Sequence, residues 1–364
     1  MGDKQGARKL LLAAGGTGGH MFPAQALAEI LRAEGWDIAL MTDARGRKHC
    51  GRIPADPVIE VQAASISPRK PLQAIKGMLK LWRGVRQAKA FIKDWKPDIV
   101  VGFGGYPAFP AMRAAQSAGL PTILHEQNAV LGRVNRVFAA KATHVVSGFE
   151  TLEKVSAAAN VSTLGNPMRT QIVEAVPDKY EAPTDGINLL IVGGSLGARI
   201  LSQILPQAVA QLPEDIRNRL SVVQQTTESE IENARQIYSD VGVSAVCESF
   251  FSNIQTHLAK AHYVVGRAGA SSVSEIALMG KPSLLIPLAI AMDDHQTVNA
   301  KTLESHGAAD ILPESEFTTE AVANILQDRL NDSNWLSSAA AAARTAGRPN
   351  AARDLAQLVV ETTS

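Results

Sequence analysis

The sequence has 364 residues, of which 46% are hydrophobic and 20% charged, and its formal net charge is +1. This length favours two domains, the composition excludes a disordered chain, and the charge indicates no particular partner. No run approaches the roughly 20 apolar residues that span a bilayer, and the N-terminus lacks the apolar core of a secretory signal. Cys50 and Cys247 lie far apart and form no C-x-x-C motif, so neither a disulfide framework nor a zinc site is supported. We expect a cytoplasmic protein.

Short apolar runs alternate along the chain with longer stretches of helical period, which is typical of parallel sheets covered by helices on both faces. The predicted strands lie at 9–14, 37–40, 57–61, 98–103, 121–125, 143–147, 187–193, 219–225, 244–248, 261–266, 282–287 and 308–312. Their grouping predicts an α/β protein with two doubly wound, Rossmann-like domains that face each other across a cleft. Ligands are then expected at the carboxyl ends of the strands.

The first glycine-rich turn joins a predicted strand to a predicted helix and reads GGTGGH, residues 15–20. Free backbone N–H groups at a helix start favour phosphate or another anion, although the glycines could serve only close packing of helix and strand. The dinucleotide fingerprint fails because Met21 stands in place of its third glycine, and Asp43 is its only partial support. A nucleotide P-loop also fails, since no Gly-Lys-Ser/Thr follows. We favour an anion-facing loop.

Two more turns of this kind follow predicted strands, within 101–111 and at 193–199. One glycine turn is weak evidence, but three in one chain predict phosphate-bearing substrates on both sides of the cleft. A further motif, RAGASSVSE at 267–275, places Ser272 and Glu275 in the spacing of a capping box that starts a helix. Glu275 could therefore serve only the cap, or could accept hydrogen bonds from a ribose, as acidic residues do in nucleotide sites.

A basic region covers residues 68–96, with nine Lys or Arg and one acidic residue. Apolar and basic side chains interleave at helical spacing, as in helices that lie on anionic lipid. The residues chosen for this membrane contact are Ile75, Leu79, Trp82, Lys76, Lys80, Arg83 and Arg86, and Met78 and Val85 continue the apolar series. The ordinary alternative is a solvated basic face whose apolar side packs in the core. Nucleic acid is not expected, because aromatic residues do not recur along a strand platform.

Metal ligation is not expected. The HEQNA sequence at 125–129 has Ala129 where a zinc motif needs its second histidine, and no D-x-D is present to hold a divalent cation against a diphosphate. Helix starts and backbone amides would have to replace a metal, and no cofactor is expected.

Seven motifs in order resemble the MurG family, the inverting N-acetylglucosaminyltransferases of bacterial peptidoglycan synthesis. They are GGTGGH (15–20), GFGGYPA (102–108), HEQN (125–128), GNPMR (165–169), GGSLGAR (193–199), RAGASSVSE (267–275) and DHQTVNA (294–300). The resemblance implies a GT-B fold. Its N-terminal acceptor and membrane-associating domain would cover 1–166, its UDP-GlcNAc-binding domain 167–346, and its C-terminal helix, within 347–364, would cross back to the first domain.

The resemblance also implies an activity: GlcNAc moves from UDP-GlcNAc to the C4 hydroxyl of MurNAc in lipid I, giving lipid II without a metal. Ser195 and the helix start would hold the diphosphate, Glu275 the ribose and the main chain of Phe251 the uracil. Arg169 and Gln296 match other donor contacts. The helix-start residues are Ala270, Ser271, Ser272, Val273 and Ser274, and Thr17, Gly18, Gly19 and Asn128 would approach the sugar.

The acceptor hydroxyl needs a proton acceptor, and His20 is the candidate because a helix start disfavours imidazolium. His20 could instead donate a hydrogen bond to the pyrophosphate, with Glu126 or water taking the proton. The resemblance places the enzyme on the cytoplasmic face of the bacterial inner membrane, with anionic lipids and other cell-wall and division proteins as partners. The alternatives are a UDP-GlcNAc epimerase, a transferase with a soluble acceptor, an NAD-dependent oxidoreductase and a non-catalytic nucleotide-sugar sensor.

Overall fold

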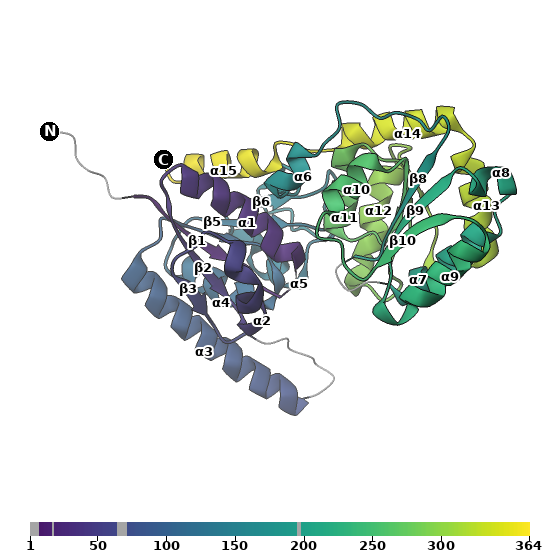
Figure 1. Ribbon diagram of the computed structural model, residues 1–364. Helices are drawn as coiled ribbons and strands as arrows, with labels where there is room; N and C mark the ends of the chain where they lie inside the picture. Colours follow the sequence, from purple (N-terminus) through teal and green to yellow (C-terminus); the bar gives the residue numbers. More distant parts are fainter. Residues whose placement is uncertain (1–6, 17, 64–70, 195–197) are drawn as a thin grey trace. The chain divides into compact units, whose positions relative to one another are not determined.

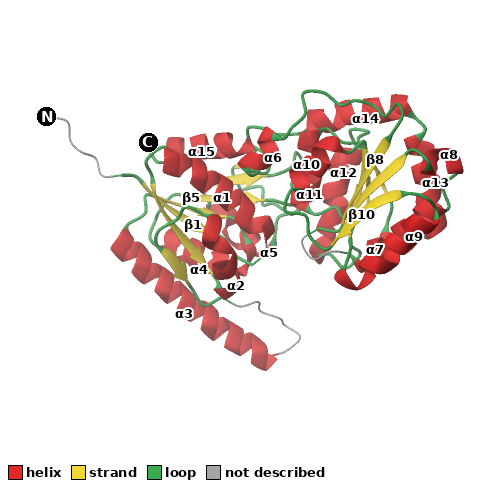
Figure 2. Ribbon diagram, in the orientation of Figure 1, coloured by secondary structure: helices red, strands yellow, loops and turns green. Residues whose placement is uncertain are grey.

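The computed structural model describes residues 7–16, 18–63, 71–194 and 198–364. The chain divides into two compact units. Unit 1 comprises Met1–Arg169 and Pro349–Ser364, and unit 2 comprises Thr170–Arg348. In each unit, helices cover both faces of a central sheet (Figures 1 and 2).

The described part of unit 1 contains a seven-stranded parallel sheet of order β3-β2-β1-β4-β5-β6-β7. Its strands are β1 Lys9–Ala13, β2 Asp37–Thr42, β3 Val58–Glu60, β4 Ile99–Gly102, β5 Thr122–Glu126, β6 His144–Ser147 and β7 Val161–Thr163. Its helices are α1 Gly18–Ala33, α2 Ala44–His49, α3 Pro71–Trp95, α4 Gly105–Ser117, α5 Arg133–Phe138 and α15 Ala351–Thr362, with 3-10 turns at Cys50–Arg52 and Ala139–Lys141.

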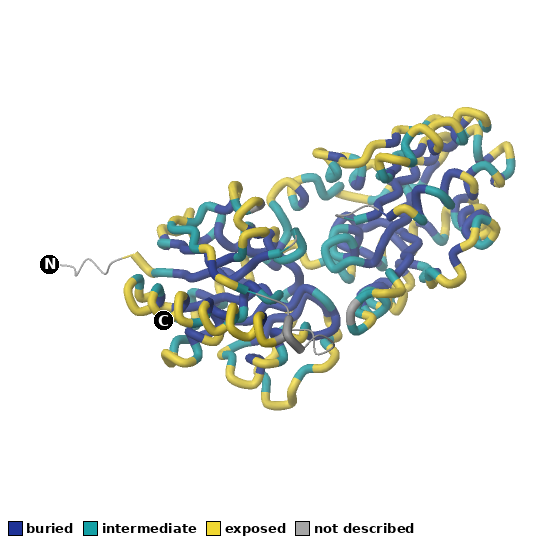
Figure 3. The backbone as a smooth tube through the Cα atoms, turned by 90° about the horizontal axis from the view of Figure 1, so that it is seen from below, coloured by how far each residue is buried: buried dark blue, intermediate teal, exposed yellow. Residues whose placement is uncertain are grey.

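The central strands β1 and β4 of unit 1 are buried and almost entirely apolar because both faces of the sheet are covered there. Along β1, Leu10 and Leu12 pack into the cluster that contains α1 and α15, whereas Leu11 packs on the opposite face with α4. Residues of α15 in the first cluster include Leu355 and Val359, so the C-terminal helix of the chain completes the core of its N-terminal unit. Figure 3 shows the buried strands as the dark blue centre of the unit.

The described part of unit 2 contains a six-stranded parallel sheet of order β10-β9-β8-β11-β12-β13. Its strands are β8 Ile187–Val192, β9 Leu220–Gln225, β10 Ser244–Glu248, β11 Tyr263–Gly266, β12 Ser283–Leu285 and β13 Ala309–Ile311. Its helices are α6 Thr170–Glu174, α7 Arg199–Ala210, α8 Glu214–Arg217, α9 Ile231–Asp240, α10 Ile254–Lys260, α11 Ala270–Met279, α12 His295–Glu304, α13 Thr319–Leu330 and α14 Ser333–Ala346. Short 3-10 turns lie at Glu228–Glu230, Met292–Asp294 and Glu314–Glu316.

Numbered within each unit, both sheets share the strand order 3-2-1-4-5-6, and unit 1 adds β7 at its edge. This order is that of doubly wound dinucleotide-binding folds, which confirms the predicted α/β class and the two Rossmann-like sheets. All twelve predicted strands are present. Strand β7 was missed because it is a short edge strand with exposed Val161 and Thr163, so it carries no buried apolar run.

Candidate functional site

The glycine turns follow the central strands of both sheets. In unit 1, β1 leads to α1, which begins at Gly18, and β4 leads to α4, which begins at Gly105. In unit 2, β8 leads to the turn at 193–194 and β11 leads to α11. Strand order reverses between β1 and β4, and between β8 and β11, so each sheet brings its turns to a topological switch point. Ligands of doubly wound sheets bind at that position.

His20 lies in the first turn of α1 and is half-buried. Its Nδ1 atom lies 2.8 Å from Oε1 of Gln127, directly beyond the end of β5. Gly105 approaches the other side of the ring with φ of +73°, and a Cβ built there would lie 3.5 Å from His20 Nε2. A side chain at position 105 would therefore be strained by the positive φ, and its Cβ would be in van der Waals contact with the His20 ring. The fold thus brings the first two glycine turns and the end of β5 together around His20.

Glu126 is buried at the end of β5, and its carboxylate organises the segment that follows. Oε1 accepts hydrogen bonds from the main-chain and side-chain nitrogens of Asn128, at 3.1 and 3.2 Å. Oε2 accepts from Gly132 N and Asn135 Nδ2, both at 2.8 Å. The two oxygens therefore bind four donors, which fix the course of the chain from Asn128 to Asn135.

His125 precedes Glu126 and is fully buried. Burial lowers its pKa to about 4, with a smaller lowering from nearby His20, although the hydrogen bond between Nε2 and Gly165 O, at 3.0 Å, opposes the shift. Gln127 links this ring to His20, because its Nε2 atom lies 3.0 Å from His125 Nδ1. Sequence analysis missed the roles of His125 and Gln127. Side chains alternate along a strand, and this spacing could have placed both residues on the face opposite Glu126.

The other predicted residues of unit 1 lie near the same turn or help to hold it. Gly18 and Gly19 are the first residues of α1, and the Arg169 guanidinium lies 4.4 Å from the Phe22 ring of that helix. Thr17 lies outside the described residues. Asp43 Oδ1 accepts hydrogen bonds from Gly46 N at 2.9 Å and from Gly16 N at 3.3 Å. The one residue that favoured an NAD site therefore caps α2 and holds the glycine turn.

In unit 2, the predicted diphosphate and ribose residues form the first six positions of α11, from Ala270 to Glu275. The predicted capping box is wrong. Gly269, in an extended conformation, is the N-cap and makes no side-chain cap, so the helix begins two residues before Ser272. Val273 is fully buried, and its N–H donates to Gly269 O. The main-chain N–H groups of 270–272 precede the first helical hydrogen bond and can face an anion.

Two further predicted residues follow strands of this sheet, one in a loop and one at the start of a helix. Phe251 is buried after β10, and its ring meets that of His257 edge-on at 5.0 Å. Gln296 lies in the first turn of α12, and its Oε1 accepts from Leu288 N at 3.0 Å, which leaves its amide nitrogen available to donate. Asp293 and Asp294 immediately before α12 both have positive φ, a strained backbone of the kind that occurs at ligand sites. Ser195 lies outside the described residues.

Helix α3 carries the predicted membrane residues, and they are exposed. Ile75, Leu79 and Trp82 each expose between 53% and 57% of their surface, as does Met78. The basic residues between them, Lys76, Lys80, Arg83 and Arg86, are also exposed. The alternative of an apolar side packed in the core is therefore wrong for these four apolar residues.

The buried side of α3 consists of different, mostly small residues: Gly77, Gly84, Ala88 and Ile92. A Cβ at Gly84 would collide with the main-chain oxygen of Gln62, so the helix approaches its neighbours closely there. None of the helices in the described part of the chain is long and apolar enough to cross a membrane. Within the same described residues, no three His, Cys, Asp or Glu side chains gather as a metal site would require.

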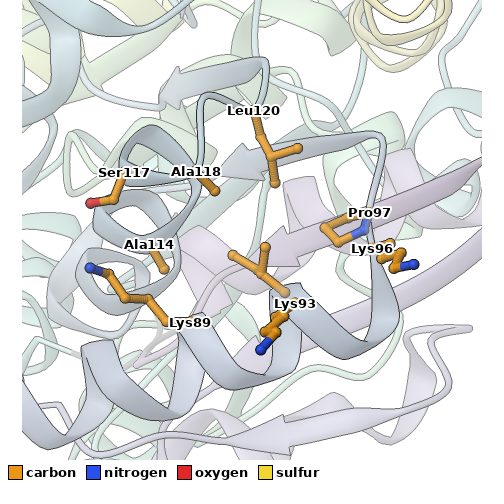
Figure 4. Close-up of a pocket in the computed structure, with 9 residues that line it drawn as sticks. Lys89, Lys93, Lys96, Pro97, Ala114, Ser117, Ala118 and Leu120 are labelled. Atoms are coloured by element: carbon orange, nitrogen blue, oxygen red, sulfur yellow. The ribbon is translucent and has the colours of Figure 1, made fainter.

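A cavity of about 400 Å³ lies elsewhere in unit 1 (Figure 4). Lys89, Ile92 and Lys93 of α3 line it, together with residues 96–97 and the end of α4. Pro97 and Leu120 precede β4 and β5, so the cavity lies at the amino ends of the strands. The glycine turns and His20 lie at the carboxyl ends, which places this cavity at the opposite edge of the sheet from the candidate site.

Comparison with known proteins gives matches over both units. Residues 10–147 match the glycosyltransferase family 28 N-terminal domain, and residues 188–358 match the glycosyltransferase family 28 C-terminal domain. A Maricaulis maris protein is 51% identical over 356 residues, covering 97% of each chain, and a Caulobacter vibrioides protein is 46% identical over 97% of this chain and 98% of its own. Both are named UDP-N-acetylglucosamine–N-acetylmuramyl-(pentapeptide) pyrophosphoryl-undecaprenol N-acetylglucosamine transferase.

The crystal structure of Acinetobacter baumannii MurG is similar in fold, with a TM-score of 0.80 at 30% identity. The similarity covers 97% of this chain and 99% of that one. Because both sheets and both family domains match over nearly the whole chain, the predicted GT-B fold is confirmed.

Proposed function

The chain belongs to the MurG family within glycosyltransferase family 28, and on that premise we propose that it transfers N-acetylglucosamine from UDP-GlcNAc to lipid I. The observation that carries the proposal is the 51% identity, along 97% of both chains, to the Maricaulis maris protein named for that transfer. The C4 hydroxyl of MurNAc attacks the anomeric carbon as the bond to UDP breaks. A single displacement of this kind inverts the anomeric configuration.

We assign the donor to unit 2. Negative charge grows on the diphosphate as the bond to the sugar breaks, and the N–H groups of 270–272 at the start of α11 would stabilise that charge. The first turn of α11 contains no acidic residue that would oppose an anion. Glu275, one turn further along, would accept hydrogen bonds from the ribose hydroxyls. These helix-start donors take the part that a divalent cation has in other sugar transferases.

We assign the proton acceptor to His20 of unit 1. Its ring lies at the switch point of the sheet, and Gly105 leaves room beside Nε2. Glu126 is the weaker candidate, because four donors already occupy its two oxygens. In the proposed step, His20 takes the hydroxyl proton as the new C1–O bond forms, and UDP leaves with the electron pair of the bond that breaks.

The test is incubation of the protein with labelled UDP-GlcNAc and lipid I, or a short-chain analogue, with and without excess EDTA. We expect a labelled disaccharide-lipid with inverted configuration, formed equally fast in EDTA. Free N-acetylmannosamine or its nucleotide would indicate an epimerase instead, and transfer only to a soluble sugar would contradict the lipid acceptor. A rate that collapses in EDTA and returns with Mg²⁺ would overturn the assignment of diphosphate stabilisation to α11 alone.

We also propose that α3 docks the enzyme on anionic lipid of the cytoplasmic face of the inner membrane. Four apolar side chains are more than half exposed on one helix among Lys76, Lys80, Arg83 and Arg86, and this pattern is that of an interfacial helix. A basic and an apolar residue of this helix also contact each other, since the Arg86 guanidinium lies 4.8 Å from the centre of the Trp82 ring.

Sedimentation with vesicles of phosphatidylglycerol and phosphatidylcholine tests the docking. Binding should rise with the phosphatidylglycerol fraction and should be lost when Leu79 and Trp82 are both replaced by Glu. The control replaces Val137 and Val246, which are also exposed apolar residues and lie outside α3, with Glu, so that the added charge is the same. Binding that ignores lipid charge, or equal losses in the two double variants, would refute the proposal.

A further inference from the structure

A row of polar side chains leads away from His20 into the interior of unit 1. Gln127 and His125 are 3% and 0% exposed, and the row ends at the main-chain oxygen of Gly165. The three links measure 2.8, 3.0 and 3.0 Å. The last atom of the row is a carbonyl oxygen, and its chemistry decides the direction of every hydrogen bond in the row.

The carbonyl oxygen of Gly165 can only accept, so His125 carries its hydrogen on Nε2. A neutral ring then presents a lone pair at Nδ1, which needs a donor opposite it, and the amide nitrogen of Gln127 supplies that donor. A second carbonyl fixes the same amide orientation, because Gln127 Nε2 also lies 3.2 Å from His125 O. Gln127 Oε1 is therefore the atom that faces His20.

An amide oxygen can only accept, so the ring nitrogen opposite it must carry a hydrogen. We infer that Gln127 and His125 are positioning residues that hold neutral His20 in the tautomer with hydrogen on Nδ1 and a lone pair on Nε2. The other tautomer would set two lone pairs against each other at a buried contact. Main-chain contacts reinforce the arrangement, since Asn166 Nδ2 donates to Gln127 O at 3.0 Å.

This inference rests on the proposed function for its consequence. If His20 is the proton acceptor, it can act only through the nitrogen that lacks a hydrogen. The row makes that nitrogen Nε2, which lies on the side of the ring that faces Gly105. His125 stays neutral and passes on no proton in this scheme. Its burial and its bond to Gly165 O serve to keep the amide of Gln127 oriented.

Nitrogen NMR of the full chain, with its histidines labelled on both ring nitrogens, tests the tautomer without any assay of activity. At a pH where the ring is neutral, His20 should show a hydrogen-bearing Nδ1 and a bare Nε2, assigned by comparison with His20→Ala. A hydrogen on Nε2 in the unaltered protein would overturn the inference.

The variant Gln127→Met keeps the length of the side chain but removes both its donor and its acceptor. Its His20 should show a mixture of tautomers, and kcat should fall about tenfold or more, with the KM of both substrates nearly unchanged. Gln25→Met is the matched control, because Gln25 lies on the same helix and its amide bonds only to the side chain of Glu29 in the described contacts. An unchanged tautomer, or an unchanged kcat despite a lost tautomer, would overturn the positioning role.

These outcomes separate this inference from the proposed function. A fixed tautomer in the unaltered protein, together with full turnover by His20→Ala, would leave the row intact as structure and refute both His20 as the base and the positioning role. If the unaltered protein transfers GlcNAc to lipid I but its His20 shows a mixture of tautomers, the proposed function holds and the positioning role of Gln127 and His125 is refuted. Thermal unfolding of Gln127→Met confirms that any loss is measured on folded protein.

Discussion

The two units share one topology, but different chemical groups lie at their topological switch points. In unit 1 the edge carries titratable side chains, His20, His125 and Glu126, which are tied into buried hydrogen bonds. In unit 2 the corresponding edge offers the main-chain N–H groups of α11, hydroxyl side chains and Glu275. The strand order 3-2-1-4-5-6 is common to both. Topology therefore decides where a ligand binds, and the residues at the turns decide what can be done to it.

The difference is also one of rigidity. The polar groups of unit 1 bind to one another, whereas the helix start of unit 2 holds donors that helical geometry leaves without an internal acceptor. Side chains that move a proton must be held at fixed positions, and donors that stabilise charge must remain available until the ligand arrives. The comparison predicts that changes in unit 1 affect turnover and local stability, and that changes in unit 2 affect donor binding.

The largest expected effect is that of His20→Ala. Loss of a general base typically lowers turnover by about 10²–10⁴-fold. With both substrates saturating we expect a fall in kcat of that size, while the KM for UDP-GlcNAc stays nearly unchanged because the residues assigned to the diphosphate and ribose at the start of α11 belong to unit 2. His306→Ala, the same substitution in the turn that follows α12, is the control. Near-native turnover of the His20 variant would place the base elsewhere.

Glu126→Gln should act on stability first. The variant sets an amide NH₂ group against some of the four donors that the carboxylate now accepts, so we expect a loss of about 3 kcal/mol in the free energy of unfolding. Urea unfolding measures the loss, and Glu153→Gln, at an exposed position, is the control. If Glu126 were instead the proton acceptor, kcat would collapse while the unfolding free energy stayed the same.

Both units should gain stability as pH rises, but in different pH ranges. His125 has a folded pKa of about 4 against the usual 6.5, so the unfolded chain binds the proton first. The contribution of His125 to the stability of unit 1 is therefore fully present above pH 6.5. The free energy of unfolding falls by about 3 kcal/mol as pH drops toward 4. Lys281 of unit 2 is buried, and that burial lowers its pKa to about 8 from 10.5. Here the native state releases the proton first, so unit 2 gains about 3 kcal/mol as pH rises from 8 to 10.5.

Urea unfolding at several pH values separates these effects. Trp335 is the single tryptophan of unit 2 and reports its unfolding, whereas Trp36, Trp82 and Trp95 report that of unit 1. In His125→Gln, unit 1 should no longer lose the stability attributed to the imidazole as pH falls. In Lys281→Met, unit 2 should no longer gain stability as pH rises from 8 to 10.5. A variant whose pH dependence equals that of the unaltered protein would show that the group titrates alike in both states.

Much of the fold could be predicted from the sequence because buried parallel strands are continuous apolar runs of distinctive length. The prediction that each of the three glycine turns follows a strand is also confirmed, since each turn begins directly after an apolar run. The start of α11 did not, because the spacing of Ser272 and Glu275 satisfies a capping box while Gly269 adopts the extended conformation that ends the preceding loop. Local spacing alone cannot choose between two possible starts of one helix.

The row behind His20 could not be predicted because its members are 107 residues apart in the sequence at one link and 40 at another. Only the pairing of β5 beside β4, and of β4 beside β1, brings Gln127 to the first turn of α1. The exposed apolar face of α3 was undecided for a related reason. Helical spacing gives two candidate faces, and the small residues at positions 77, 84 and 88 are the ones that allow close packing.

The smallest expected effect belongs to Glu275→Ala. In the proposed site its carboxylate accepts from the ribose of the donor, and such charge-assisted hydrogen bonds are worth about 1.5–3 kcal/mol. We expect the KM for UDP-GlcNAc to rise about 10- to 100-fold, with a smaller change in kcat. The Kd for UDP, measured by calorimetry, should rise in parallel, and Glu304→Ala at the end of α12 is the control. A fall in kcat with unchanged donor affinity would break the division of roles between the units, because it would give unit 2 a part in moving the proton.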